Sequence, residues 1–252
     1  MRLYMITSLN DNKTGLRDLA FSIRIDLPHI VGDLAVTTTF SELTPGPTLT
    51  IAQQIEQRIR AIHAQLSASL NAYPNAVDDA ADMLRRWMVQ GKVVRVIGAG
   101  RARLAAAIPA NRIAHGGAQV YVQDDIVPMP HTINGGGLIA ASASGRTESV
   151  LAVLHSTRKY TRDVEVLGIA ASSATEFASL CDIFIGIEPA PPEVPNPLRA
   201  LADTEEYVIS ELLDGLVVSA GKLGGFDDAY WRLGHEDVGA TGPYGFMQKE
   251  QK

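Results

Sequence analysis

The chain has 252 residues, of which 46% are hydrophobic and 20% are charged, a composition typical of a soluble α/β protein with a sizeable core. Its formal net charge of −6 argues against a nucleic-acid binder, which usually carries a basic excess. Cys181 is the only cysteine, so no internal disulfide can form, and we recognise neither a signal peptide nor an apolar run long enough for a membrane span. These features predict a cytoplasmic protein without nucleic-acid or membrane partners.

The first 46 residues carry no recognisable motif. Residues 1–6 could form a strand, residues 15–36 could form a helix or a strand, and residues 37–48 have the Pro and Gly punctuation of a loop. No helix-turn-helix pattern is evident. We therefore predict an N-terminal extension of unknown role at 1–46 and a single domain at 47–252.

Two helices are predicted next. Residues 50–70 place isoleucines and a leucine at helical spacing: Ile51, Ile55, Ile59, Ile62 and Leu66. Residues 75–91 form a second helical pattern that ends at Gly91, a residue suited to a helix C-terminal cap.

From Lys92 onward, strands alternate with helices. Such alternation predicts βαβ units, and hence a three-layer α/β sandwich with a mostly parallel sheet flanked by helices. The Pro-rich segment at 188–197 is predicted to be a rigid connector, and a long helix is predicted from near Asp203 to Gly221. The predicted strands are 92–100, 118–123, 135–145, 163–171 and 181–188, and the predicted helices between them are 101–117, 146–160 and 173–180.

A cluster of hydroxyl side chains follows one predicted strand and opens the next helix. It contains Ser142, Ser144 and Thr147 around Gly145. Ligands of parallel sheets bind beyond the carboxyl ends of the strands, and helix N-termini offer free N–H groups to anions. The pattern favours a site for a phosphate monoester. The alternative is that these hydroxyls only cap the helix.

A second glycine turn joins a strand to a helix at Gly98 and Gly100. It is not a complete dinucleotide-binding fingerprint, because Arg103 stands where the third glycine would be, and it lacks the P-loop lysine. The turn nevertheless predicts a second helix N-terminus at the same edge of the sheet.

The segments at 97–117, 120–130 and 138–150 together resemble the sugar isomerase (SIS) family of phosphosugar-binding domains, most closely the 6-phospho-3-hexuloisomerases. The resemblance covers about residues 50–240. It implies the flavodoxin-like SIS fold, a phosphate held by the hydroxyl cluster, and further contacts from the glycine turn. Two positions depart from the family pattern: Ala102 replaces a phosphate-binding serine, and Arg146 stands where Glu or Gln is usual. The substrate-binding residues it implies are Gly98, Gly100, Arg101, Ser142, Ser144, Gly145 and Thr147.

The resemblance also implies candidate acid–base groups, since sugar isomerisation through an enediol needs a positioned base and a proton shuttle. His115 matches a histidine proposed to be catalytic in the family, and Asp203 falls on the family's glutamate, with Glu206 one turn further on as its rival. His235 resembles a C-terminal histidine of the family that could reach a neighbouring subunit's site, and it is a further substrate-binding residue that the resemblance implies. Alternatively, His115 and the two acids only complement helix dipoles. No metal-ligand spacing is evident, and no cofactor is expected.

The leading hypothesis is therefore a phosphosugar isomerase that converts 3-hexulose 6-phosphate to fructose 6-phosphate through a cis-enediol. The alternatives are another sugar-phosphate isomerase, of the phosphoheptose or pentose-phosphate type, and a non-catalytic phosphosugar sensor. The resemblance implies a homodimer or homotetramer with shared sites. The helices at 50–70 and 205–221 are the expected contacts.

Overall fold

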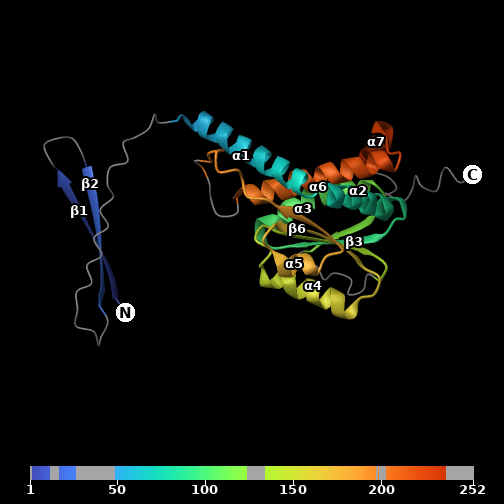
Figure 1. Cartoon of the computed structure of the whole chain (residues 1–252), viewed down its shortest axis with the longest axis horizontal. Coiled ribbons are helices and arrows are strands. Elements are labelled where there is room, and N and C mark those ends of the chain that lie inside the picture. Colours follow the sequence, from blue (N-terminus) through green and yellow to red (C-terminus); the bar gives the residue numbers. More distant parts are fainter. Residues whose placement is uncertain are drawn as a thin grey trace, which may run out of the picture. The chain divides into compact units, whose positions relative to one another are not determined.

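The chain divides into two compact units, Met1–Leu49 and Thr50–Lys252. The computed structural model describes residues 2–11, 17–26, 49–123, 134–196, 198 and 203–236. In the first unit, β1 (Arg2–Asp11) and β2 (Arg17–Asp26) pair antiparallel (Figure 1). The strand alternative for β2 is therefore the observed one, as the period-2 placement of its apolar residues favours. The predicted loop at 37–48 lies outside the described residues.

The second unit is an α/β domain built on a five-stranded sheet. Every neighbouring pair of strands is parallel, in the order β4-β3-β5-β6-β7, which confirms the predicted fold class. The strands are β3 (Val93–Gly98), β4 (Gln119–Val122), β5 (Gly137–Ser142), β6 (Glu165–Ala171) and β7 (Ile183–Ile187); the helices are α1 (Ile51–Ala72), α2 (Pro74–Val89), α3 (Gly100–His115), α4 (Glu148–Tyr160), α5 (Thr175–Ser179), α6 (Asp203–Leu223) and α7 (Asp228–Glu236).

Helices cover both faces of this sheet and make three layers (Figure 1). On one face α1, α2, α3 and α6 pack a large core against alternate strand residues such as Ile139 and Ile169. On the other face, α4 and α5 pack a smaller core against residues of the opposite parity, such as Leu138 and Val166. Because β5 is buried along its whole length, it reads as a continuous apolar run rather than an alternating one.

Helix α1 buries only its second half. A capping box between Thr50 and Gln53 begins the helix. The residues that it buries are Ala61 at the middle of the helix and Ile62, Gln65 and Ser69 in the second half. The first half extends away from the sheet (Figure 1) and leaves Ile51, Ile55 and Ile59 exposed. The predicted helix is therefore confirmed, but half of its apolar stripe has no core to face within the second unit.

Helix α7 was not predicted from the sequence. It follows α6 after a short turn and packs its aromatic residues against Phe226 of that turn. Tyr230 stacks on Phe226 with ring centroids 4.1 Å apart, and Trp231 meets both rings edge-on. The Tyr230 hydroxyl donates to the Gly116 carbonyl, 3.5 Å away, so α7 begins beside the C-terminus of α3. Among the described helices, none is long and apolar enough to cross a membrane.

A partly buried ion network fastens the amino-terminal edge of the sheet. Glu165, the first residue of β6, accepts hydrogen bonds from Arg86 at 2.7 Å, from the Trp87 indole at 2.7 Å and from Lys92 at 3.1 Å. Burial alone would raise the pKa of the Glu165 carboxyl, but these hydrogen bonds together outweigh burial and lower it. The network ties α2 and the start of β3 to the central sheet.

Candidate functional site

The chain reverses its direction across the sheet between β3 and β5. From β3 it passes to β4 on one side, and it then returns to β5 on the other side. In open α/β sheets, ligands bind at such a switch point, beyond the carboxyl ends of the strands. Gly98 at the end of β3 is in register with Ala141 of β5. The structure therefore brings the glycine turn and the hydroxyl cluster together at this edge.

The hydroxyl loop, residues 142–147, is held in shape by its own side chains. Ser142 is buried, with only 2% of the residue exposed. Its hydroxyl accepts a hydrogen bond from the Gly145 amide at 3.0 Å and lies 3.1 Å from the Thr147 hydroxyl. Ser144 is exposed, and its hydroxyl accepts the Arg146 amide at 3.3 Å. The loop thus has a partly buried pair of hydroxyls, those of Ser142 and Thr147, and one exposed hydroxyl, that of Ser144.

Gly145 is required at its position for two independent reasons. Its φ is +65°, a conformation that side chains with a Cβ rarely adopt. A Cβ placed there would lie 2.1 Å from the Ala174 Cβ and 3.2 Å from the Ala170 Cβ. Glycine therefore allows the hydroxyl loop to lie directly against the loop that follows β6.

The helix-capping interpretation finds little support in this geometry. Thr147 stands at the N-cap position of α4, yet its side chain makes no capping hydrogen bond. The two serine hydroxyls instead accept amides of the loop itself, those of Gly145 and Arg146. The loop consequently presents hydroxyls and a helix N-terminus together, the combination that suits an anion.

The glycine turn brings α3 close to the strand ends. A Cβ on Gly98 would lie 2.9 Å from the Arg103 backbone and 3.1 Å from the Ala141 carbonyl oxygen, and Gly100 has a φ of +55°. Ala102, where the SIS pattern has a serine, is 4% exposed and belongs to the core between α3 and the sheet.

Arg101 and Glu206 form an ion pair between the first turns of α3 and α6, with Nε 2.9 Å from Oε2. The Glu206 side chain is only 13% exposed, whereas that of Arg101 is 57% exposed. The pair lines a hollow of about 230 Å³ formed by residues of these two helices. Its other lining residues are Leu104, Ala105, Ile108, Tyr207 and Ser210, none of which belongs to the hydroxyl loop.

Two further predicted residues are placed only by their backbone. Asp203 begins α6, one turn before Glu206, and His235 lies in α7. Their side chains, and the whole of His131, lie outside the described residues. Among the side chains that are described, no group of three or more His, Cys, Asp or Glu residues could hold a metal ion.

His115 lies far from the other predicted residues of its own chain. Helix α3 begins at Gly100, at the carboxyl edge of the sheet, and ends at His115. At 1.5 Å per residue this helix is roughly 22 Å long from end to end. His115 is therefore at the opposite edge of the sheet, and a chain cannot bring it to its own hydroxyl loop.

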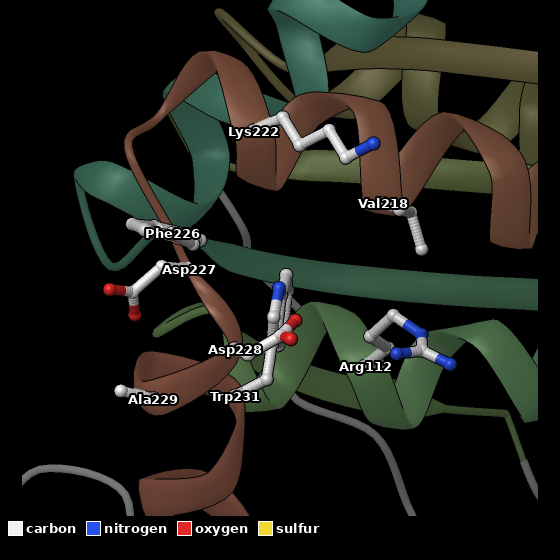
Figure 2. Close-up of a pocket in the computed structure, with 8 residues that line it drawn as sticks. All are labelled: Arg112, Val218, Lys222, Phe226, Asp227, Asp228, Ala229 and Trp231. Atoms are coloured by element: carbon white, nitrogen blue, oxygen red, sulfur yellow. The ribbon is translucent and has the colours of Figure 1, made fainter.

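A second pocket, of about 540 Å³, lies at that opposite end, between α3, the last turns of α6 and the start of α7 (Figure 2). Arg112 contributes to its wall and is paired with Asp214 at 2.9 Å, while its guanidinium lies 5.9 Å from the Trp231 ring centroid. Lys222 and Asp228 also line the pocket. None of the predicted site residues does so.

One carboxylate at the carboxyl edge was missed from the sequence. Glu188 follows β7 directly and accepts the Ser172 hydroxyl at 3.2 Å, and it is also hydrogen bonded to Tyr73. Burial, the larger cause, and the nearby Glu188 carboxylate both raise the pKa of the Tyr73 hydroxyl. An acidic residue directly after an apolar strand indicates this edge of the sheet, so the sequence does contain a signal for Glu188. The Pro-rich run that begins there predicts only a connector.

No protein-family model matches the sequence, and no curated protein matches it either. Solved structures do match the fold over about three quarters of the chain. A Methanococcus jannaschii protein, whose structure is described as inferring a function of 3-hexulose-6-phosphate isomerase, is 20% identical with a TM-score of 0.54, and the match covers 73% of this chain and 97% of that one.

Two other matches have different descriptions. The Vibrio vulnificus NanR protein, solved in complex with ManNAc-6P, is 16% identical, with a TM-score of 0.57 and coverage of 73% of this chain and 68% of that one. The sugar isomerase domain of an RpiR transcription factor from Sphaerobacter thermophilus is 14% identical, with a TM-score of 0.53 and coverage of 74% and 98%. At these identities the similarity establishes a shared fold.

Proposed function

We propose that this chain, which has the fold of sugar isomerase (SIS) domains, is a phosphosugar isomerase of the SIS family. The observation that carries the proposal is the hydroxyl loop at 142–147, which combines hydroxyl groups with the start of α4 at the switch point of the sheet. A phosphate monoester is the ligand that such a loop suits best. The solved structures described as binding or isomerising sugar phosphates support this choice of ligand.

The proposed reaction moves a carbonyl group between neighbouring carbons through a cis-enediol. A base removes the proton next to the carbonyl, and a second group moves protons between the two oxygens. The most concrete substrate is 3-hexulose 6-phosphate, with fructose 6-phosphate as the product. Phosphoheptose or pentose-phosphate isomerisation is the alternative within the same chemistry, and neither needs a metal or a cofactor.

For the base we propose a carboxylate from the first turn of α6, either Glu206 or Asp203. The Glu206 side chain is largely buried and is paired with Arg101, an arrangement that fixes the carboxylate in place. Arg101 directly follows Gly100 of the glycine turn, and this turn lies beside the end of β5. The pair is therefore anchored to the same edge of the sheet as the hydroxyl loop.

We propose that the histidine comes from a second subunit. His115 is at the far end of α3 in its own chain, and His235 follows on α7, so either can serve only a neighbouring copy's loop. Exposed apolar side chains offer the contact: Ile51, Ile55 and Ile59 on α1, Leu104 and Ile108 on α3, and Tyr207 on α6. We therefore propose a homodimer or homotetramer with shared sites, and we propose the cytoplasm as its location.

A non-catalytic phosphosugar sensor is the second candidate. Two observations favour a sensor. The sugar isomerase domain of an RpiR transcription factor shares this fold, and Ala102 stands where the SIS pattern has a serine. A sensor would bind sugar phosphate through the same hydroxyl loop without turnover.

The test is a turnover and thermal-shift screen of the purified protein against a panel of sugar phosphates, with His115→Ala, Asp203→Asn and Glu206→Gln alongside. We expect one ketose phosphate to be converted, and the His115→Ala variant and one of the two acid variants to lose that activity. Stabilisation without turnover would favour the sensor. The absence of any response to sugar phosphates would refute both candidates.

Mixing inactive variants tests the shared site separately. Subunits that carry the inactive acid variant, either Glu206→Gln or Asp203→Asn, and subunits that carry His115→Ala would each be inactive alone, yet mixed oligomers would contain some intact sites. We expect partial recovery of activity after the subunits are exchanged. Full activity of a monomer in light scattering would contradict the shared site.

A further inference from the structure

We infer that Glu188 is a sugar-binding residue, whose carboxylate accepts hydrogen bonds from hydroxyl groups of the ligand at the end away from its phosphate. The inference rests on the proposed function, because it deepens the description of the same site. It adds a specificity-determining residue that neither the SIS resemblance nor the sequence motifs identified.

The position of Glu188 is the first support. It is the residue directly after β7, so it emerges at the carboxyl edge of the sheet, as the hydroxyl loop does after β5. The two strands are separated only by β6. With neighbouring strands about 4.8 Å apart, the two loops lie roughly 10 Å from each other, a span comparable with an extended sugar phosphate.

Direct contacts connect the two places. Gly145 of the hydroxyl loop lies against Ala174, in the turn that follows β6. The same turn contains Ser172, whose hydroxyl donates to the Glu188 carboxylate at 3.2 Å and whose amide donates to the Ile187 carbonyl at 3.0 Å. The turn after β6 thus touches both the hydroxyl loop after β5 and the Glu188 side chain after β7.

The carboxylate is fixed but remains accessible. The Tyr73 hydroxyl and the Ser172 hydroxyl are its hydrogen-bond partners, and the Glu188 side chain is only partly buried. The Tyr73 ring is held by its edge-on contact with Phe184, and its hydroxyl lies over Gly186, where a Cβ would come within 2.4 Å of it. A carboxylate has about four lone-pair sites, so two hydroxyl donors leave acceptor capacity for a ligand.

The structural contact that Glu188 makes with α1 comes from its backbone amide and not from its side chain. The Glu188 amide donates to the Ser69 hydroxyl at 3.0 Å, and that hydroxyl donates to the Gln65 carbonyl at 2.8 Å. This chain of hydrogen bonds already fastens the end of β7 to α1 through the backbone. Any residue type at 188 other than proline could keep it, so the connection does not require a glutamate side chain.

The test compares Glu188→Gln with two controls by calorimetric titration of the full chain. Glu193→Gln removes the same charge from an exposed glutamate in the same segment, and Ser69→Ala breaks the backbone anchor but leaves the carboxylate. Each protein is titrated with fructose 6-phosphate and, separately, with inorganic phosphate. The ratio of the two affinities isolates the contribution of the sugar.

For Glu188→Gln we expect roughly a tenfold or greater loss of fructose 6-phosphate affinity, because hydrogen bonds to a charged acceptor are replaced by neutral ones. Affinity for inorganic phosphate should stay the same or rise, because a negative charge near the dianion has been removed. Glu193→Gln should change neither affinity. Ser69→Ala should lower the melting temperature but leave the affinity ratio unchanged.

Three results would overturn the inference. If Glu188→Gln keeps the parent's affinity for both ligands, Glu188 does not contact the sugar, while the proposed function stands. If Glu188→Gln and Ser69→Ala weaken both ligands to the same extent, the role of Glu188 is structural. If the parent binds neither these two ligands nor any other sugar phosphate of the panel, the proposed function itself fails and the inference fails with it.

Discussion

The two edges of the central sheet use similar residues for opposite purposes. At the amino-terminal edge, the Glu165 carboxylate is enclosed by Arg86, Trp87 and Lys92, which donate to it at 2.7–3.1 Å. At the carboxyl edge, the hydroxyl loop presents the exposed Ser144, and Glu188 is held by two hydroxyls with room for further donors. The first edge completes its hydrogen bonds within the chain, whereas the second leaves capacity for a ligand.

Polar residues alone therefore do not distinguish the candidate site from the rest of the described chain. The pocket at the opposite end (Figure 2) also contains Arg112, Lys222 and two aspartates, but Arg112 is already paired with Asp214. The distinguishing features of the carboxyl edge are the hydroxyl loop, the helix start and the switch point. Substitutions at the amino-terminal edge should therefore lower stability alone, whereas substitutions at the carboxyl edge should weaken ligand binding.

The largest expected effect comes from Gly145→Ala. A Cβ at 2.1 Å from Ala174, in a left-handed conformation, should lower the free energy of unfolding by about 2–5 kcal/mol and abolish sugar-phosphate binding. Gly225→Ala is the control, because it has a φ of +79° but nothing within 4 Å of the added atom. The control should cost only about 1–2 kcal/mol in urea unfolding and leave binding intact. Equal losses in both variants would contradict the close contact.

The next largest effect is expected from Glu165→Gln, which should lower the stability of the protein without changing its affinity for ligands. Removal of a carboxylate that three groups share is expected to cost about 1–3 kcal/mol at neutral pH, since hydrogen bonds to a charged acceptor are lost. Titration with fructose 6-phosphate should give the parent's affinity. A loss of affinity without a loss of stability would reverse the assignment of the two edges.

The same variant gives a prediction for pH. Because the folded protein has a lowered Glu165 pKa, the stabilisation is present above the ordinary value of 4.5 and is lost as the pH falls through the lower folded value. The parent should therefore lose its stability advantage over Glu165→Gln below about pH 4.5. Melting temperatures measured from pH 7 to pH 3 would check this, and a constant difference would refute it.

Ser144→Ala should lower the affinity for a sugar phosphate without changing the stability of the protein. The side chain is exposed, so the melting temperature should stay within about 1 °C of the parent's, as for most surface substitutions. Affinity for a sugar phosphate should fall roughly tenfold, because one hydrogen bond to a charged phosphate is lost. Ser219→Ala, at an exposed serine on α6, is the control and should change neither quantity. An unchanged affinity in Ser144→Ala would remove the phosphate assignment of the loop.

The smallest effect on binding is expected from Ala102→Ser. The residue is 4% exposed in the core of α3, so the added hydroxyl would be directed into packed side chains rather than toward a ligand. Affinity should change by less than in Ser144→Ala, with a stability cost of about 1 kcal/mol. A large gain in affinity would mean that the α3 turn binds phosphate as the family pattern does.

Much of the fold could be predicted because its signals are local. The alternation of strands and helices and the glycines at 98, 100 and 145 predicted the parallel sheet and its carboxyl edge. Two features depend on tertiary structure. The isoleucines at 51, 55 and 59 have helical spacing, yet they stay exposed, because periodicity does not reveal which part of a helix reaches the core. Glu188 acquires its partners from the end of α1 and from the turn after β6, which are distant in sequence.

The arrangement of the candidate site could be predicted in part, because some of its residues are close together in the sequence. Hydroxyls and glycines within one loop could be recognised together, and the structure brings them together. His115 matched a family position, but sequence spacing cannot say that α3 carries it roughly 22 Å away from the turn where the helix starts. The ion pair of Arg101 with Glu206 depends on the packing of α3 against α6, and no motif announces it.

The most direct test of the central claim is a crystal structure of the protein with fructose 6-phosphate. We predict that the phosphate group lies at the hydroxyl loop, within hydrogen-bond distance of Ser144 and Thr147 and of the first amides of α4. Phosphate bound instead in the pocket between α6 and α7, or no bound ligand at a concentration that saturates binding in solution, would contradict the assignment of the carboxyl edge as the functional one.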